Sequence, residues 1–280
     1  MAHKLAVIAV LGLTASAVCI GAGAAIGGKD FGGWEGLSLF DGKPRCDVLS
    51  GRTAGSRDFD WDGSDSFGLA VLGRASYAPN GPARMNVTGD PQVLAHLRLR
   101  DGTLEMDCRG WRDRTRDLAI TLPGRSFRKF SILGGGNLAL DRLDQDAAKI
   151  EINGAGEVQA NGRIGALKMT VNGSGRTDFD QLFSRHAEAQ IHGSGTIRAK
   201  GKIDDVKIRI AGSGDVDFGQ AETQTADVEI NGHGDVHIAP SQQAKVEING
   251  SGDVYLHKDP KTLDTEMHGS GQIHKVGSGT

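Results

Sequence analysis

The C-terminal half of the chain repeats one short motif, a strand-like segment interrupted by Gly-x-Gly, as in KVEINGSGDVYLH at residues 245–257. Successive copies are 18 to 20 residues apart, and their leading glycines are Gly134, Gly154, Gly173, Gly193, Gly212, Gly232, Gly250 and Gly269. A fixed period of this size is typical of a solenoid, in which each repeat is one structural unit stacked on the next. A Gly-x-Gly that cradles a phosphate would be needed only once.

Apolar and polar residues alternate around each Gly-x-Gly. In residues 245–257 the side chains assigned to the interior are Val246, Ile248, Val254 and Leu256, and those assigned to the surface are Glu247, Asp253 and Tyr255. A period of two indicates strands with one buried face, so we expect two short strands per repeat, joined at the glycines. The predicted fold is all-β: a single-stranded right-handed parallel β-helix of about eight rungs, preceded by irregular strands forming its first rungs.

The composition agrees with a fold rich in corners. Glycine accounts for 42 of 280 residues, whereas proline accounts for 7 and aromatic residues for 5%. Glycine suits sharp corners because it adopts positive φ and tolerates close stacking. The formal net charge of -3 argues against a nucleic-acid partner. The segment RGWRDRTRD at 109–117 fits either a solvated loop or strand face or a polyanion contact, and its interleaved aspartates favour the first interpretation.

The N-terminus has the pattern of an export signal. His3 and Lys4 precede an uncharged run from Leu5 to Gly28 that becomes rich in small residues near its end. Residues 1–27 are therefore predicted to be a signal peptide or a membrane anchor, and this is the only membrane contact that we expect. Residues 28–55 are interpreted as a Gly-rich tether. Residues 56–280 are predicted to form the β-helix domain, with irregular N-terminal strands at 56–125 and regular rungs at 126–280.

The two cysteines outside the N-terminal segment are Cys46 and Cys108. An oxidising compartment permits a disulfide between them, and two inert thiols are the alternative. At the other end, a last rung without a polar cap exposes a strand edge. We therefore expect self-association through the C-terminal rung, residues 265–280.

These residues resemble a known family. The TLP of 121–123, the preceding VTGD and DGTLEM, and the repeated INGSGDV rungs are similar to the head GIN domain family of bacterial auto-transporter adhesin-like proteins. The segment FDWDGSDSFGLAVLGRASY at 59–77 resembles the opening strands of such domains in Gram-negative relatives. The resemblance spans roughly residues 56–276. It implies an exported, mostly single-domain β-helix, suggests a role in adhesion by the name of the family, and supplies no catalytic residues.

Calcium sites are weakly indicated. DFDWDG at 58–63 matches the first half of a calcium loop, but Leu69 occupies the twelfth position, where a bidentate glutamate is needed. Asp215, Asp235 and Asp253 follow the second glycine of their repeats. Calcium-binding nonapeptide rolls place one residue between that glycine and the aspartate. We therefore interpret this aspartate column as hydrogen-bonding caps of the corners.

Zinc and enzyme sites are also weakly indicated. His237 and His274 share an outward column, but Tyr255 stands between them, so no converging set of zinc ligands is expected. Polysaccharide-cleaving β-helices carry clustered carboxylates or basic residues in long loops, whereas the connections here are short. No catalytic residue, metal or cofactor is predicted.

The sequence thus favours a non-enzymatic cell-envelope protein that presents a β-helical rod for adhesion or envelope scaffolding. The alternative is a carbohydrate-active β-helix enzyme acting on an envelope or extracellular polysaccharide. The expected location is the periplasm, outer membrane or surface of a Gram-negative bacterium, and the expected partner is a glycan or another cell-surface ligand. The candidate contact surface consists of outward residues Glu229, Glu247, Asp215, Asp235, Asp253, His237, Tyr255 and His274.

Overall fold

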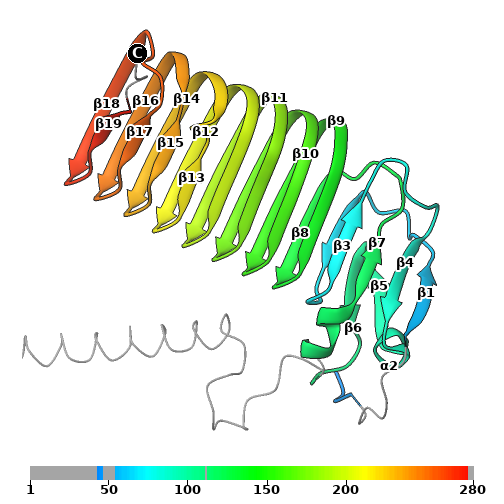
Figure 1. Ribbon diagram of the computed structural model, residues 1–280. Coiled ribbons are helices and arrows are strands. Elements are labelled where there is room, and N and C mark those ends of the chain that lie inside the picture. Colours follow the sequence, from blue (N-terminus) through cyan, green and yellow to red (C-terminus); the bar gives the residue numbers. More distant parts are fainter. Residues whose placement is uncertain (1–42, 47–53, 111, 277–280) are drawn as a thin grey trace, which may run out of the picture. The chain divides into compact units, whose positions relative to one another are not determined.

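The computed structural model describes residues 43–46, 54–110 and 112–276 (Figure 1). The predicted signal peptide or anchor at 1–27 and most of the predicted tether lie outside these residues. The domain described below lies within the unit Pro44–Thr280. No helix within the described ranges has the length and apolar character needed to cross a membrane.

Residues 129–275 form a parallel β-solenoid, as the repeat predicts (Figure 1). Each coil pairs in parallel with the next, and the leading glycines of successive motifs are register partners, from Gly134 with Gly154 to Gly250 with Gly269. The strands are β8 (Lys129–Gly134), β9 (Asn137–Gly154), β10 (Glu157–Gly173), β11 (Arg176–Gly193), β12 (Thr196–Gly212), β13 (Asp215–Asp217), β14 (Ala221–Gly232), β15 (Val236–Ile238), β16 (Pro240–Gly250), β17 (Val254–Leu256), β18 (Thr262–Gly269) and β19 (Ile273–Lys275).

The division of each repeat into two short strands is correct only for the later coils. There a three-residue strand, such as β15, precedes a longer one, such as β16. In the earlier coils, β9 to β12 each run as one strand of 17 or 18 residues from one glycine corner to the next. The second bend of these coils lies inside the strand, where the pairing shifts register, for example after Ala160. In β9 to β12 the backbone pairing therefore continues through the bend, where the alternation of apolar and polar residues alone predicts a break between two strands.

The core follows the predicted inward columns. One such column is almost fully buried and contains Ile152, Val171, Ile191, Ile210, Ile230 and Ile248. Burying one aliphatic side chain completely is worth about 1.5–3 kcal/mol, so the stacked column is a main source of stability. Because inward and outward positions alternate, this core also fixes which side chains face solvent.

Glycine at the corner is required by both conformation and space. Gly212 has a φ of +133°, and a Cβ at this position would lie 2.3 Å from the carbonyl oxygen of Gly193 on the preceding coil. The same carbonyl oxygen accepts the N–H of Ser213 at 2.9 Å. The corner is therefore a tight stacking point of the solenoid.

A further coil without the glycine motif precedes the regular repeats. Strands β2 (Ser66–Leu69) and β3 (Arg74–Tyr77) pair in parallel with β8 and β9. Phe67 is the partner of Phe130, and Leu69 is the partner of Ile132, so the inward columns continue into this coil. A long insertion, residues 78–128, separates it from the next coil.

The insertion and β1 (Gly55–Phe59) form short elements beside that coil. β4 (Met85–Gly89) pairs antiparallel with β1 and β7 (Ala119–Thr121), and α2 (Pro91–Ala95) follows β4. β5 (Leu97–Arg100) and β6 (Thr103–Met106) form a hairpin. Its turn contains Asp101 and Gly102, both with positive φ. The arginine-rich segment, predicted to be a loop or strand face, instead contains the 3-10 helix η1 (Arg112–Asp117).

A disulfide joins Cys46 to Cys108, with their Cα atoms 5.0 Å apart. Beside it, the N–H of Cys46 donates to the carbonyl of Arg109, and the N–H of Arg109 donates to the carbonyl of Pro44, both at 2.8 Å. Residues 44–46 are therefore attached to the domain, although the sequence places them in the tether.

Candidate functional site

The aspartates after the second glycine cap the corners of the last coils. Oδ1 of Asp215 accepts the N–H of Asp235 at 3.1 Å, and Oδ1 of Asp235 accepts the N–H of Asp253 at 3.0 Å. Oδ1 of Asp253 accepts the N–H of Gln272 at 2.8 Å. In earlier coils the corresponding N–H donates to a glycine carbonyl, as Arg176 does to Gly156. The interpretation of this column as corner caps agrees with these contacts.

An aromatic stack runs beside the aspartate column. The rings of His237 and Tyr255 are nearly parallel, with centroids 4.4 Å apart, and those of Tyr255 and His274 are 4.8 Å apart. Nε2 of His274 lies 3.3 Å from Oδ2 of Asp253. Desolvation, together with the carboxylates of Asp235 and Asp253, raises the pKa of Tyr255. Its phenol is therefore neutral at physiological pH and can donate a hydrogen bond.

His257 lies against this stack, a contact not predicted from the sequence. Its Nε2 lies 3.0 Å from Nδ1 of His237. The ring covers Gly219, where a Cβ would lie 2.8 Å from the His257 ring. His257 and Gly219 each directly follow an inward residue, Leu256 and Phe218. The sequence does contain a signal for this contact. His257 and Gly219 occupy the same position in coils that are two apart, and a glycine leaves space for a long side chain from a nearby coil.

The glutamates of the candidate surface lie on the other side of the glycine corner. Glu229 pairs with Arg209 at 3.4 Å and accepts a hydrogen bond from Asn231, and Glu247 accepts one from Asn249. They belong to a column before the corner, whereas the aspartates and aromatic rings follow it. The structure therefore brings together the predicted Asp, His and Tyr residues but places the two glutamates on an adjoining face.

In the earlier coils the glutamates on this face form ion pairs with lysine and arginine side chains of the same or adjacent coils, so their charges are neutralised. Glu151 pairs with Lys129 and Lys149 at 3.1 and 3.0 Å. Although burial raises the pKa of Glu151, hydrogen bonds from Lys149, Asn153 and Lys129 outweigh it and lower the pKa to about 2. Glu188 pairs with Lys168 and Arg209. These residues hold adjacent coils together and are poorly suited to bind a charged ligand.

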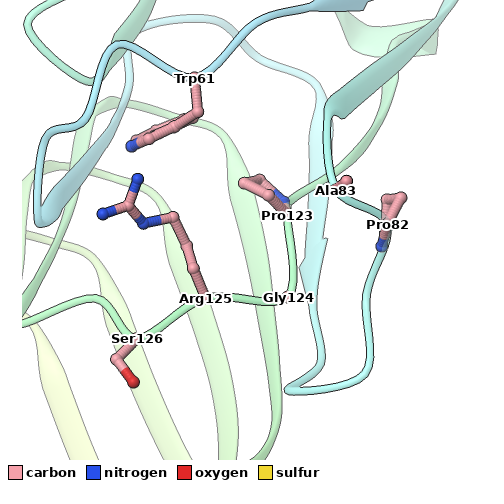
Figure 2. Close-up of a pocket in the computed structure, with 7 residues that line it drawn as sticks. All are labelled: Trp61, Pro82, Ala83, Pro123, Gly124, Arg125 and Ser126. Atoms are coloured by element: carbon pink, nitrogen blue, oxygen red, sulfur yellow. The ribbon is translucent and has the colours of Figure 1, made fainter.

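A hollow lies in the N-terminal part of the domain (Figure 2). It has a volume of about 430 Å³ and is lined by Trp61, Pro82, Ala83, Pro123, Gly124, Arg125 and Ser126. The indole of Trp61 packs edge-on against Phe127, and its Nε1 donates to the carbonyl of Ser64 at 2.7 Å. Arg125 is exposed at the rim. An aromatic wall with a guanidinium nearby can accept a flat or anionic group.

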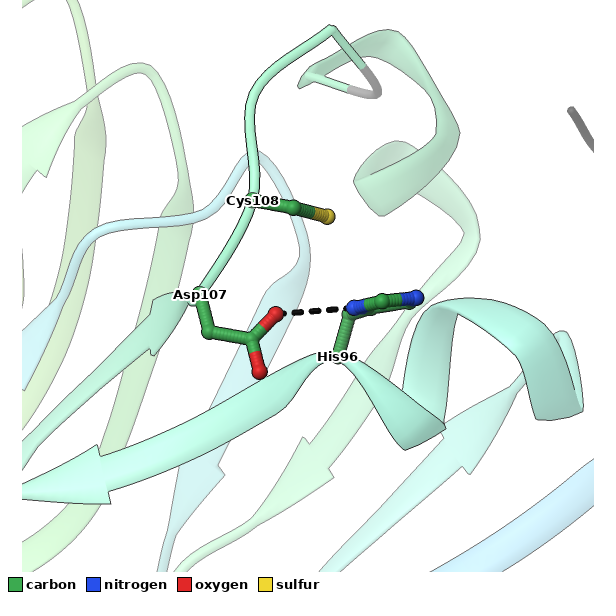
Figure 3. A group of neighbouring side chains, drawn as sticks. All are labelled: His96, Asp107 and Cys108. Carbon is green, nitrogen blue, oxygen red and sulfur yellow. Dashed lines mark hydrogen bonds and ion pairs between the residues drawn. The ribbon is translucent and has the colours of Figure 1, made fainter. Parts of the chain in front are cut away.

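His96, Asp107 and Cys108 form the one group of three candidate metal-binding side chains found among the described residues (Figure 3). Nδ1 of His96 lies 2.8 Å from Asp107, and Arg98 forms an ion pair with the same carboxylate. Cys108 is bonded to Cys46 and offers no thiolate. A metal ion needs the deprotonated sulfur, so in the disulfide form this group is an ion-pair cluster.

The fold and its outer columns define a parallel β-solenoid domain with polar ladders on its outward faces. The chain belongs to the family described as "Putative auto-transporter adhesin, head GIN domain", whose model matches residues 80–260. This match confirms the resemblance carried by the INGSGDV repeats. No curated protein sequence matches the chain.

Solved structures of three bacterial proteins share the fold. A protein from Parabacteroides distasonis, described as a putative lipid binding protein, is 20% identical, with a TM-score of 0.71 over 80% of this chain and 97% of that one. A putative adhesin from Parabacteroides merdae is 18% identical, with a TM-score of 0.69 over 80% and 96%. A putative adhesin from Bacteroides fragilis is 16% identical, with a TM-score of 0.61 over 80% and 97%. At these identities the likeness concerns the fold alone.

Proposed function

We propose that this protein is an exported, non-enzymatic envelope protein whose solenoid binds a glycan or another cell-surface ligand, in adhesion or in envelope scaffolding. The family description supports an adhesin-like role. The observation that carries the proposal is the stack of His237, Tyr255 and His274 beside the aspartate column. Aromatic rings provide apolar contact area, and carboxylates accept hydrogen bonds from hydroxyl groups.

The scaffold suits recognition because it holds these side chains at fixed spacing. Successive coils are joined by parallel backbone pairs, and the aspartates are further fixed by their hydrogen bonds to the next coil. Side chains that are already ordered lose little conformational entropy on binding. A repeating ligand such as a polysaccharide can contact several coils at once, so weak individual contacts add up.

Binding is tested with the purified protein on a glycan array and on bacterial cells. Tyr255→Ala removes the central ring of the stack and should weaken binding by about tenfold, as truncation of a central aromatic residue does. Phe183→Ala is the matched control because it removes an exposed aromatic ring from another outward column. Equal loss in both variants, or none in either, would contradict the assignment of this face.

The same preparation separates binding from catalysis and locates the protein. Incubation with envelope and extracellular polysaccharides should leave them intact, and release of reducing sugars or unsaturated products would favour the carbohydrate-active enzyme instead. Cell fractionation with N-terminal sequencing should find the protein outside the cytoplasm and show whether residues 1–27 are removed. Recovery from the cytoplasm with an intact N-terminus would contradict export.

A further inference from the structure

Two histidine nitrogens approach each other on the outward face of the last coils. Nδ1 of His237 and Nε2 of His257 are 3.0 Å apart, and their rings are tilted by 38°. His257 belongs to the coil after that of His237, so its side chain extends back along the solenoid. Both residues are only partly exposed. Imidazole nitrogens are ligands that first-row transition metals prefer.

The surroundings hold both rings in place. Tyr255 stacks on His237 with an interplanar angle of 7°, which fixes the plane of that imidazole. Gly219 leaves the space that the His257 ring occupies, since a Cβ there would lie 2.8 Å from Nε2. Preorganised rings lose little freedom when they bind an ion. The two nitrogens are therefore held close enough together to share one metal ion.

We propose that His237 and His257 form a binding site for a divalent transition metal ion, with Cu²⁺ or Ni²⁺ favoured over Zn²⁺. At metal–nitrogen distances of about 2.0–2.1 Å, two nitrogens 3.0 Å apart subtend about 90–100° at the metal. This angle suits adjacent ligands of a square-planar or tetragonal ion. Tetrahedral Zn²⁺ needs a wider angle.

Metal binding requires a change of tautomer. In the present N–H···N hydrogen bond one facing nitrogen carries the hydrogen, whereas a bound metal needs a lone pair on both. The hydrogens then lie on Nε2 of His237 and Nδ1 of His257, so a neutral pair releases no proton. Each ring must also turn by about 40°, because the facing nitrogens of a hydrogen bond point at each other and the metal lies to one side of the line that joins them. Acid weakens binding because protonated imidazoles cannot coordinate.

A carboxylate lies in the column of His237, on the preceding coil. It belongs to Asp217, whose Oδ1 accepts the N–H of Gly219 at 3.1 Å. The carboxylate is thus tied to the glycine that the His257 ring covers. Among the described residues, Asp217 does not form a three-residue ligand group with the two histidines, so water completes the coordination of the ion. This inference goes beyond the proposed adhesive function and stands without it.

The test is Cu²⁺ titration of the full chain without a histidine tag, followed by calorimetry and electron paramagnetic resonance. Every sample carries His3→Ala, because a free amino terminus with histidine at position 3 binds Cu²⁺ by itself. The expected result is one Cu²⁺ per chain with nitrogen coordination. Binding should be at least tenfold weaker in both His237→Ala and His257→Ala. His233→Ala, an exposed histidine on the same coil as His237, is the matched control and should bind normally.

A second variant keeps both histidines but displaces one ring. Gly219→Val should weaken Cu²⁺ binding as much as His257→Ala, because the new side chain occupies the position of the His257 ring. Circular dichroism without metal checks that each variant retains its strands. The proposal is overturned if Cu²⁺ binding is absent, if folded His257→Ala and His233→Ala bind equally well, or if Zn²⁺ binds more tightly than Cu²⁺.

Discussion

At the scale of single residues, one carboxylate oxygen determines where the short strands begin. In the coils from β10 to β13 the N–H after the second glycine donates to a backbone carbonyl, and the strand starts at that residue. In the coils of β15, β17 and β19 an aspartate Oδ1 takes over as the acceptor, and each strand starts one residue later. An aspartate side chain therefore replaces one backbone carbonyl as the hydrogen-bond acceptor, and no backbone N–H is left unpaired at the corner.

Removal of that acceptor gives the first prediction. Asp235→Ala leaves the N–H of Asp253 without its carboxylate partner and should lower the free energy of unfolding by about 1–2 kcal/mol. Asp235→Asn retains an oxygen acceptor and should cost less than half as much. Urea unfolding monitored by circular dichroism measures both variants. Equal losses would mean that the charge of Asp235, and not its hydrogen bond, stabilises the corner.

Glu151 predicts a specific dependence on pH. Its pKa falls from the ordinary 4.5 to about 2 in the folded protein, so its stabilising contribution is complete above pH 4.5 and is lost as the pH falls from 4.5 to about 2. The full shift corresponds to about 3 kcal/mol. Because Lys129 and Lys149 are 42% exposed and screened by solvent, we expect about 1–2 kcal/mol for Glu151→Gln at pH 7.

The measurement compares unfolding of Glu151→Gln and the original protein from pH 7 to pH 2. Their difference should stay constant down to about pH 5, shrink below it and approach zero near pH 2. Glu266→Gln is the control, since Glu266 lies in the same outward column on the last coil and its side chain is 65% exposed. Its effect should stay within about 0.5 kcal/mol throughout. A constant difference for Glu151→Gln down to pH 2 would rule out the lowered pKa.

At the scale of elements, the sequence predicts the regular coils well and the first coil poorly. The alternation around Gly154 to Gly250 correctly predicts which residues face inward, because a strand with one buried face must alternate. The coil of β2 and β3 lacks Gly-x-Gly, and 51 residues, 78–128, separate it from β8, so no period reveals it. Its continuity with the core is seen only in the folded structure, where Phe67 pairs with Phe130 and Leu69 with Ile132. Parallel pairing between strands so far apart in the sequence depends on the tertiary structure, so no local sequence pattern predicts it.

The disulfide stabilises this less regular N-terminal part. Cys46 and Cys108 are 62 residues apart in sequence, and a crosslink over such a loop restricts the unfolded chain. Replacing both with serine should lower the free energy of unfolding by about 2–4 kcal/mol. Thermal unfolding measures the change. A reductant should lower the melting temperature of the original protein and leave that of the double variant unchanged, and insensitivity of both would contradict the bond.

At the scale of the whole domain, the candidate surface could be predicted only in part. Outward positions follow from alternation, so Asp253 and Tyr255 were identifiable from the sequence. The contact between His237 and His257 was not, because it depends on a side chain that extends along the solenoid into space left by Gly219. The hollow beside Trp61 likewise arises from loops at 82–83 and 123–126 that are distant in sequence. Both features arise from packing between segments that are distant in the sequence, so no local sequence pattern predicts them.

We propose that the last described coil associates with a second copy of the domain. Within the described residues, β18 pairs with β16 along one edge only, and all eight of its residues are exposed. Leu263 and Met267 are 37% and 53% exposed, which is unusual for positions that continue an inward apolar column. A strand with a free edge and apolar side chains favours pairing with another strand. We therefore expect the purified protein to self-associate through residues 265–280, which include most of β18.

Sedimentation velocity and light scattering over a range of protein concentrations test this expectation. The apparent mass should rise above that of one chain, 29.4 kDa, as concentration increases. Met267→Lys and Leu263→Lys should keep the protein monomeric, because a charge at the edge must be desolvated when strands pair. Leu133→Lys is the matched control, since Leu133 is 44% exposed on β8 at the opposite end of the regular coils. A monomeric mass at every concentration, or an equal effect of Leu133→Lys, would show that the exposed edge of β18 does not drive association.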